Sequence, residues 1–189
     1  MFRPELHARY SNGFTLIELL IVVAIIAILA AIAVPNFLEA QTRAKVSRTQ
    51  SDMRSVGIAL DSYNVDNGTY PIVTSGVNWY PLSARIRVLS TPLAYIASIP
   101  RDIFPDLKNS AFPSPTDVDT FDYYSKSSDA PGTDNATLFG RLWRLASAGP
   151  DLHQGWGDVP YDATNGTKSG GDIWLIQGGG NGWPYKNNV

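Results

Sequence analysis

The feature that most constrains this chain is an unbroken apolar run near its N-terminus. Residues 14–34 contain only two side chains that are not apolar, Thr15 and Glu18. As an α-helix this run is about 31 Å long, which matches the hydrocarbon core of a bilayer. The sequence therefore predicts a helix that is inserted in a membrane at some stage.

Glu18 is the unusual residue of this run. An ionised carboxylate inside a spanning segment costs roughly 2.5 to 3.5 kcal/mol on insertion scales, so it needs a partner or a proton. We therefore expect Glu18 to have a functional role. The alternative is that its carboxylate lies close enough to the helix end to reach the water of the headgroup region.

The residues around Glu18 form a motif that reads GFTLIEL over residues 13–19. A short polar leader with Arg3 and Arg9 precedes the motif, and the apolar run after it ends at Pro35. This arrangement resembles the class III signal of type IV pilins and of type II secretion pseudopilins. The resemblance is dense over residues 11–37.

The resemblance implies a processing site and an assembly residue. In that family a prepilin peptidase cuts after the glycine and methylates the new amine, so cleavage is expected between Gly13 and Phe14. Glu18 then becomes the fifth residue of the mature chain, and Pro35 lies where many family members carry a helix-loosening proline. The new amine would lie one helical turn from the Glu18 carboxylate, and in a packed array it can neutralise the glutamate of a neighbour and set the register.

A second interpretation of the N-terminus is an ordinary secretory signal. Ala31, Ile32 and Ala33 form an A-x-A pattern, and cleavage there would leave Val34 as the first residue of a secreted domain. The apolar run is longer than a typical signal core and contains Glu18, which favours the pilin-type signal.

Composition narrows the classes of function. The net charge is −2, and no large basic field is present, so nucleic-acid binding has little electrostatic support. The chain has no cysteine, so an exported domain must be stabilised by its core or by a metal. Many type IV pilins close a C-terminal loop with a disulfide, and its absence shifts the resemblance towards pseudopilins.

The helical pattern continues beyond the apolar run. Met53, Val56, Leu60 and Tyr63 follow 3-4-3 spacing and predict one buried stripe on a helix that extends to residue 64. Asn67, Gly68 and Pro71 then predict its end. We expect a leader (1–13), a transmembrane half-helix (14–35), an amphipathic half-helix (36–64) and a globular domain (65–189).

The sequence of the globular part predicts an α+β, pilin-like fold, in which the long helix packs on a small antiparallel sheet. Helical spacing and an N-cap at Thr91 before Pro92 predict two short helices, at 82–90 and 92–98. Aromatic-rich and apolar segments predict strands at 121–126, 138–146 and 173–177, with a hairpin between the first two. The glycine-rich last dozen residues predict a loosely ordered tail.

Oxygen-rich turns between the second and third predicted strands suggest a calcium site. Asp151, Asp158 and Asp172 offer carboxylates without a His or Cys ligand set, which suits a hard cation. Major pseudopilins bind calcium in a corresponding C-terminal loop, although this chain has a longer insertion there. The alternative is that these aspartates only initiate turns.

Other chemistry has less support. Ser147, Asp151 and His153 form no recognised nucleophile motif, so we predict no enzymatic activity. A sugar-stacking surface would need the aromatic side chains of the C-terminal domain, which more often fill a core or an interface. The candidates for that surface are Trp143, Trp156, Trp174 and Trp183.

The sequence thus predicts a structural subunit of a filament, most similar to the major pseudopilin of type II secretion. The resemblance implies a homo-oligomeric filament, minor pseudopilins, a prepilin peptidase, an inner-membrane assembly platform and membrane lipid as partners. It also implies an inner-membrane location with a cytoplasmic N-terminus and a periplasmic domain. The alternatives are a type IV pilus pilin and a membrane-tethered carbohydrate-binding module.

Overall fold

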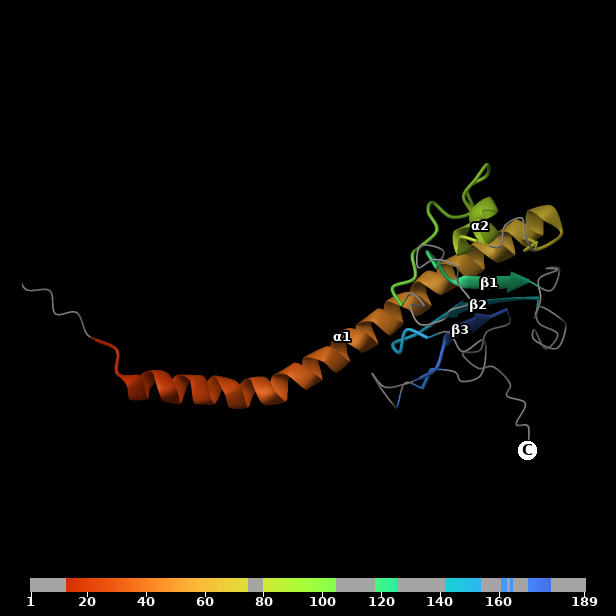
Figure 1. The fold of residues 1–189 in the computed structure, drawn as a ribbon. Helices are drawn as coiled ribbons and strands as arrows, with labels where there is room; N and C mark the ends of the chain where they lie inside the picture. Colours follow the sequence, from red (N-terminus) through yellow and green to blue (C-terminus); the bar gives the residue numbers. More distant parts are fainter. Residues whose placement is uncertain are drawn as a thin grey trace, which may run out of the picture. The chain divides into compact units, whose positions relative to one another are not determined.

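The computed structural model describes residues 13–74, 80–104, 118–125, 142–153, 161–162, 164 and 170–177 (Figure 1). The chain divides into two compact units, Met1–Leu38 and Glu39–Val189. The first long element, α1 (Leu16–Asn67), contributes to both units. The predicted helix over 14–64 is therefore confirmed, with ends displaced by two and three residues.

The first unit is the apolar part of α1. All of its described residues are exposed, and the exposed fraction of Leu16 is 86%. The segment is helical because every backbone group can be satisfied within it, which is also what a lipid environment requires. By length and composition it can cross a membrane.

In the second unit, the remainder of α1 packs on the domain through the predicted stripe. Met53, Val56 and Leu60 are each at most 1% exposed, and Tyr63 packs against the same core. The stripe is thus core, as its spacing predicts. Gly68 ends the helix with φ +69°, and its N–H donates to the Asn64 carbonyl at 2.8 Å.

Three antiparallel strands in the order β1-β2-β3 form the sheet: β1 (Asp122–Ser125), β2 (Trp143–Ser147) and β3 (Ile173–Ile176). Tyr123 lies opposite Leu145, which lies opposite Leu175, and all three belong to the core that includes the α1 stripe. The α+β fold class and the three predicted strands are confirmed. The turn of the predicted hairpin lies outside the described residues.

The helical segment before the sheet is shorter than predicted. An α-helix, α2 (Leu82–Ile86), and a 3₁₀ turn, η1 (Arg87–Leu89), together cover the predicted helix at 82–90. The predicted helix at 92–98 is wrong, because the N–H groups of Tyr95 and Ile96 both donate to the Leu89 carbonyl. These bonds fold the segment back in a wide turn instead of a helical repeat.

Candidate functional site

The predicted processing site lies just before α1. Gly13, Phe14 and Thr15 have no regular secondary structure, and Phe14 is 74% exposed. Among the described residues, apart from its neighbours in the chain, no atom lies within 4 Å of where a Cβ on Gly13 would be. The peptide bond between Gly13 and Phe14 is therefore accessible, as proteolysis requires. Cleavage and methylation stay predictions.

Thr15 and Glu18 form a reciprocal set of hydrogen bonds at the start of α1. The Thr15 N–H and hydroxyl donate to Glu18 Oε2 at 2.9 and 2.7 Å, and the Glu18 N–H donates to Thr15 Oγ1 at 3.3 Å. This is a capping box, which satisfies amides that a helix N-terminus otherwise leaves unpaired. The T-x-x-E pattern is its sequence signature, so Thr15 could have been singled out beside Glu18.

Pro35, the second predicted assembly residue, lies inside α1 and is exposed. Because proline has no N–H, the Ala31 carbonyl receives no helical hydrogen bond from position 35. The helix nevertheless continues to Asn67. A role of Pro35 in loosening the helix stays a prediction.

A polar network joins the second half of α1 to the sheet. Asp61 Oδ1 accepts hydrogen bonds from the Tyr70 hydroxyl and from Trp143 Nε1, each at 3.1 Å. Gln177 Nε2 donates to the Tyr70 hydroxyl at 3.0 Å, and the Gln177 N–H donates to the Trp143 carbonyl at 3.2 Å. Asp61 thus connects the helix to β2 directly, and to Gln177 after β3 through the Tyr70 hydroxyl.

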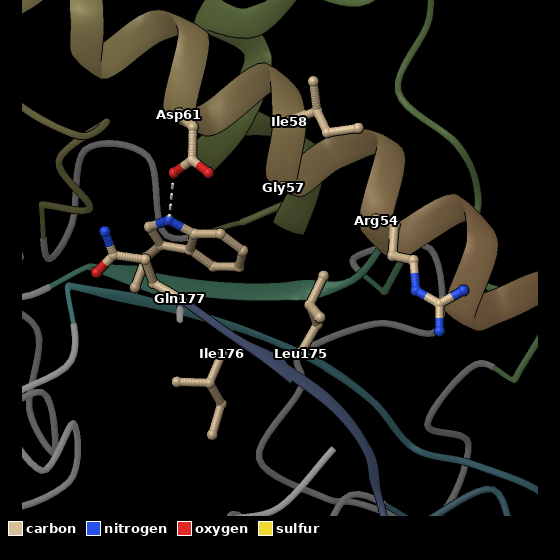
Figure 2. A pocket seen from close by; sticks show the side chains of 8 residues that line it. Arg54, Gly57, Ile58, Asp61, Leu175, Ile176 and Gln177 are labelled. Atoms are coloured by element: carbon tan, nitrogen blue, oxygen red, sulfur yellow. Dashed lines mark hydrogen bonds between the residues drawn. The ribbon is translucent and has the colours of Figure 1, made fainter. Parts of the chain in front are cut away.

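A groove with a volume of about 330 Å³ lies beside this network (Figure 2). Gly57, the Trp143 indole and Leu175 are among the residues that line it. A Cβ added to Gly57 would lie 2.9 Å from Trp143 Cη2, so only glycine permits this close approach of helix and indole. The other residues that line the groove are Arg54, Ile58, Asp61, Ile176 and Gln177.

One face of the sheet carries a buried cluster of charged and aromatic side chains. Asp122 of β1 accepts a hydrogen bond from Arg85 of α2, and Arg144 of β2 lies 3.9 Å from the same carboxylate. Both guanidinium groups lie over the Tyr124 ring, at 4.7 and 4.9 Å, and Arg144 also lies 5.1 Å from the Trp174 ring. Burial, reinforced by the Asp122 charge, raises the pKa of Tyr124 to about 12. The cluster has a structural role, because each of its members is at most 7% exposed.

The predicted calcium loop is described in part. Asp151 Oδ2 would lie 3.7 Å from a Cβ on Gly170, so the turn after β2 lies beside the segment that leads into β3. Asp172 is 2% exposed, whereas Asp158 lies outside the described residues. No group of three or more His, Cys, Asp or Glu side chains that could hold an ion occurs among the residues that the structure describes. Two of the predicted ligands are thus on adjacent segments, and a complete site would need a donor from outside them.

Ser147 and His153, near the same turn, have different hydrogen-bond partners. The Ser147 hydroxyl donates to Asp102 Oδ1 at 2.9 Å, and His153 donates its backbone N–H to Asp151 Oδ1 at 3.2 Å. The sequence does not identify Asp102 as a partner of Ser147, because the two residues lie 45 positions apart. Burial raises the pKa of Asp102 to about 7, while hydrogen bonds from the Phe104 N–H and Ser147 lower it.

The predicted tryptophan surface is only partly described. Trp143 and Trp174 are 3% and 5% exposed and belong to the interior, so they cannot stack on a sugar. Trp156 and Trp183 lie outside the described residues. The two tryptophans that the structure describes therefore do not support a carbohydrate-binding module.

Two families match the chain. Residues 8–34 match the prokaryotic N-terminal methylation motif, and residues 36–138 match type II secretion system protein G. No solved structure matches the chain.

Individual relatives come from two kinds of filament system. The type II secretion system core protein G of Vibrio cholerae is 32% identical over 64% of this chain and 83% of its own length. The core protein G of Pseudomonas aeruginosa is 42% identical over 36% of this chain, and the type IV major pilin PilA of Myxococcus xanthus is 34% identical over 57%. These last two alignments cover 49% and 57% of the relatives, so the chain spans about half of their length.

Proposed function

Because the chain belongs to the family of type II secretion system protein G, we propose that it is a structural subunit of a secretion pseudopilus. The observation that carries the proposal is the succession of a methylation motif over 8–34 and the protein G match over 36–138. The exposed apolar half of α1 supports it, since such a surface is stable only in lipid or against other helices.

The proposed mechanism is mechanical. The subunit is anchored in the inner membrane with its domain in the periplasm, and a prepilin peptidase removes residues 1–13. Subunits then leave the membrane through an assembly platform and join minor pseudopilins in a filament. Apolar contacts between α1 helices supply most of the cohesion. Glu18 sets the register by pairing with the methylated amine of Phe14 in a neighbouring subunit.

Processing is tested at the N-terminus of the protein purified from its own cells. We expect mass spectrometry to find Phe14 first, with one added methyl group. A Gly13→Leu variant should keep residues 1–13 and stay in the membrane. A mature chain that begins at Val34 would instead indicate an ordinary signal peptidase and overturn the proposal.

Assembly is tested by comparing two carboxylates of the same helix. Glu18→Ala should lower the yield of filaments at least about tenfold, which corresponds to the loss of about 1.4 kcal/mol per contact. Glu39→Ala is the control, because Glu39 lies outside the apolar run, where its side chain is 46% exposed and pairs with Arg43. Normal filament yield in the Glu18→Ala strain would refute the register role.

A type IV pilus is the second candidate, and the similarity to pilins of Myxococcus xanthus and Thermus thermophilus favours it. The two systems differ in what a deletion strain loses. Loss of an exported protein from the medium supports the secretion pseudopilus. Loss of surface filaments seen by electron microscopy, together with adhesion or motility and with normal secretion, supports the pilus.

Calcium binding is a further part of the proposal. Asp151 and Asp172 lie on adjacent segments and offer the hard oxygen donors that Ca²⁺ prefers, and Asp158 would add a third. A bound ion would neutralise these carboxylates and hold the turn after β2 against the start of β3. We expect a chelator to lower the melting temperature of the wild-type protein and to leave an Asp151→Asn variant unchanged. Equal melting temperatures with and without chelator would contradict calcium binding.

A further inference from the structure

The groove beside α1 is an apolar surface next to the point where the described chain ends. Gln177, which lines it, is the last residue that the structure describes. Figure 2 shows Leu175 below the helix, with Gln177 at the Asp61 end and Arg54 at the other. On the rim, Ile58 is 69% exposed. Such a surface favours an apolar or aromatic occupant.

We propose that the groove binds the C-terminal segment of its own chain, residues 178–189, with the Trp183 side chain against Ile58 and Leu175. Trp183 follows Gln177 by six residues, which span up to about 20 Å when extended. The groove follows α1 from Asp61 back to Arg54, a distance of about 10 Å along the helix. The segment is thus long enough to reach every part of the groove without any other rearrangement.

The sequence of the segment fits this role. Gly178, Gly179 and Gly180 form a spacer that can follow a tight path, and Trp183, Pro184 and Tyr185 then form a compact apolar group. A tryptophan that enters an apolar groove buries a large area at a low cost in side-chain entropy. The glycine-rich tail predicted from composition is, on this view, a tether with an anchor near its end.

The positive charge of Arg54 favours an aromatic side chain of the tail at the far end of the groove. Within the part of the chain that the structure describes, Arg54 makes no hydrogen bond or ion pair, so its guanidinium is available at the far end of the groove. An aromatic ring that reaches this end gains a cation–π contact, and Tyr185 follows Trp183 by two residues. Asp61, at the near end, already accepts two hydrogen bonds and needs no partner from the tail.

The inference does not depend on the proposed filament. It describes an intramolecular contact that covers an apolar groove in each subunit and fastens the end of β3 to α1. It is therefore tested on the full chain, purified in detergent, where no filament is required.

The absence of cysteine from the chain allows a direct test by cross-linking. A double variant, Ile58→Cys with Gly182→Cys, places one thiol on the groove rim and the other beside Trp183. The control pairs Gly182→Cys with Ser55→Cys, because Ser55 is exposed on the same helix but does not line the groove. We expect the groove pair to form an intrachain disulfide about tenfold faster than the control, since docking raises the effective concentration of the thiols.

A third variant shows whether the aromatic anchor is responsible. Trp183→Ala, added to the groove pair, should slow cross-linking to the rate of the control. Equal rates in the groove pair and the control would overturn the inference, and so would a rate unchanged by Trp183→Ala. A disulfide-linked dimer as the main product would assign the groove to a second copy of the chain and would also overturn it.

Discussion

Residues 16–38 and residues 39–67 of α1 are helical for different reasons. In the first segment every residue is exposed, whereas Glu39, the first residue of the second segment, is partly buried. The second segment contributes seven buried residues to the domain: Val46, Thr49, Met53, Val56, Gly57, Ala59 and Leu60. The first segment therefore has only its own hydrogen bonds, whereas tertiary packing stabilises the second.

This difference shows which kind of contact each segment makes. The second segment satisfies its apolar stripe within its own chain, so its side chains must fit particular neighbours. The first segment leaves its aliphatic side chains for lipid or for other helices, which accept many apolar shapes. We therefore expect substitutions of buried residues in the second segment and in the sheet to lower the stability of the domain. Exchanges of one apolar residue for another in the first segment should leave that stability unchanged.

The largest expected effect comes from the buried charge cluster. Asp122→Asn removes the carboxylate that pairs with the two arginines Arg85 and Arg144, so we expect a loss of about 3 to 5 kcal/mol in the free energy of unfolding. Urea unfolding followed by tryptophan fluorescence measures it. The control is Asp52→Asn, which breaks a surface pair with the exposed Arg48 and should cost less than about 1 kcal/mol. Similar losses in both variants would contradict the structural role of the cluster.

A pair of leucine substitutions tests the comparison directly. Leu60→Ala leaves a cavity in the core, because Leu60 is 0% exposed, and should cost about 2 to 5 kcal/mol. Leu29→Ala makes the same chemical change in the first segment, where Leu29 is 62% exposed. The same urea measurement should find no change in the domain for Leu29→Ala. A loss of stability there would show that the first segment supports the domain.

The sequence predicts those parts of the fold whose signal is local. The 3-4-3 spacing of Met53, Val56 and Leu60 predicts their burial, and the apolar and aromatic segments predict three strands. The helix predicted after Thr91 is wrong, since Leu89 accepts hydrogen bonds from residues 95 and 96 that spacing alone does not reveal.

The polar contacts between distant residues were not predicted, because pairing depends on topology. Asp61 and Trp143 are 82 positions apart, and Arg85 and Asp122 are 37 positions apart. Sequence periodicity places each of these residues on a helix or strand but does not choose its partner. Glu18 is the opposite case, since its partner Thr15 lies three positions away and forms a recognisable pattern.

A smaller effect is expected where α1 touches the sheet. Gly57→Ala improves helix propensity by about 1 kcal/mol, but its Cβ would lie 2.9 Å from the rigid Trp143 ring. We expect a net loss of about 1 to 2 kcal/mol as the helix and the indole move apart. Ser55→Ala, at an exposed position one half-turn away, is the control and should stay within about 0.5 kcal/mol. A stabilised Gly57→Ala protein would mean that the close approach is not needed.

The smallest effect is a pH dependence that belongs to the domain alone. The folded-state pKa of Asp102 is raised from 3.8 to about 7, so the unfolded chain releases this proton at lower pH than the folded one. Its contribution to stability is therefore complete below about pH 4 and is lost as the pH rises through about 7. Because Asp102 is half-buried, we expect this loss to be on the order of 1 kcal/mol.

Asp102→Asn should remove that loss, since asparagine keeps an acceptor for Ser147 and Phe104 but does not titrate. Relative to wild type, the variant should gain stability between about pH 4 and pH 8 in urea unfolding. A relative loss over the same range would mean that the two donors, which favour the ionised carboxylate, outweigh its burial. The Leu29→Ala protein should follow the wild-type pH profile throughout, because Leu29 is 62% exposed and carries no titratable group.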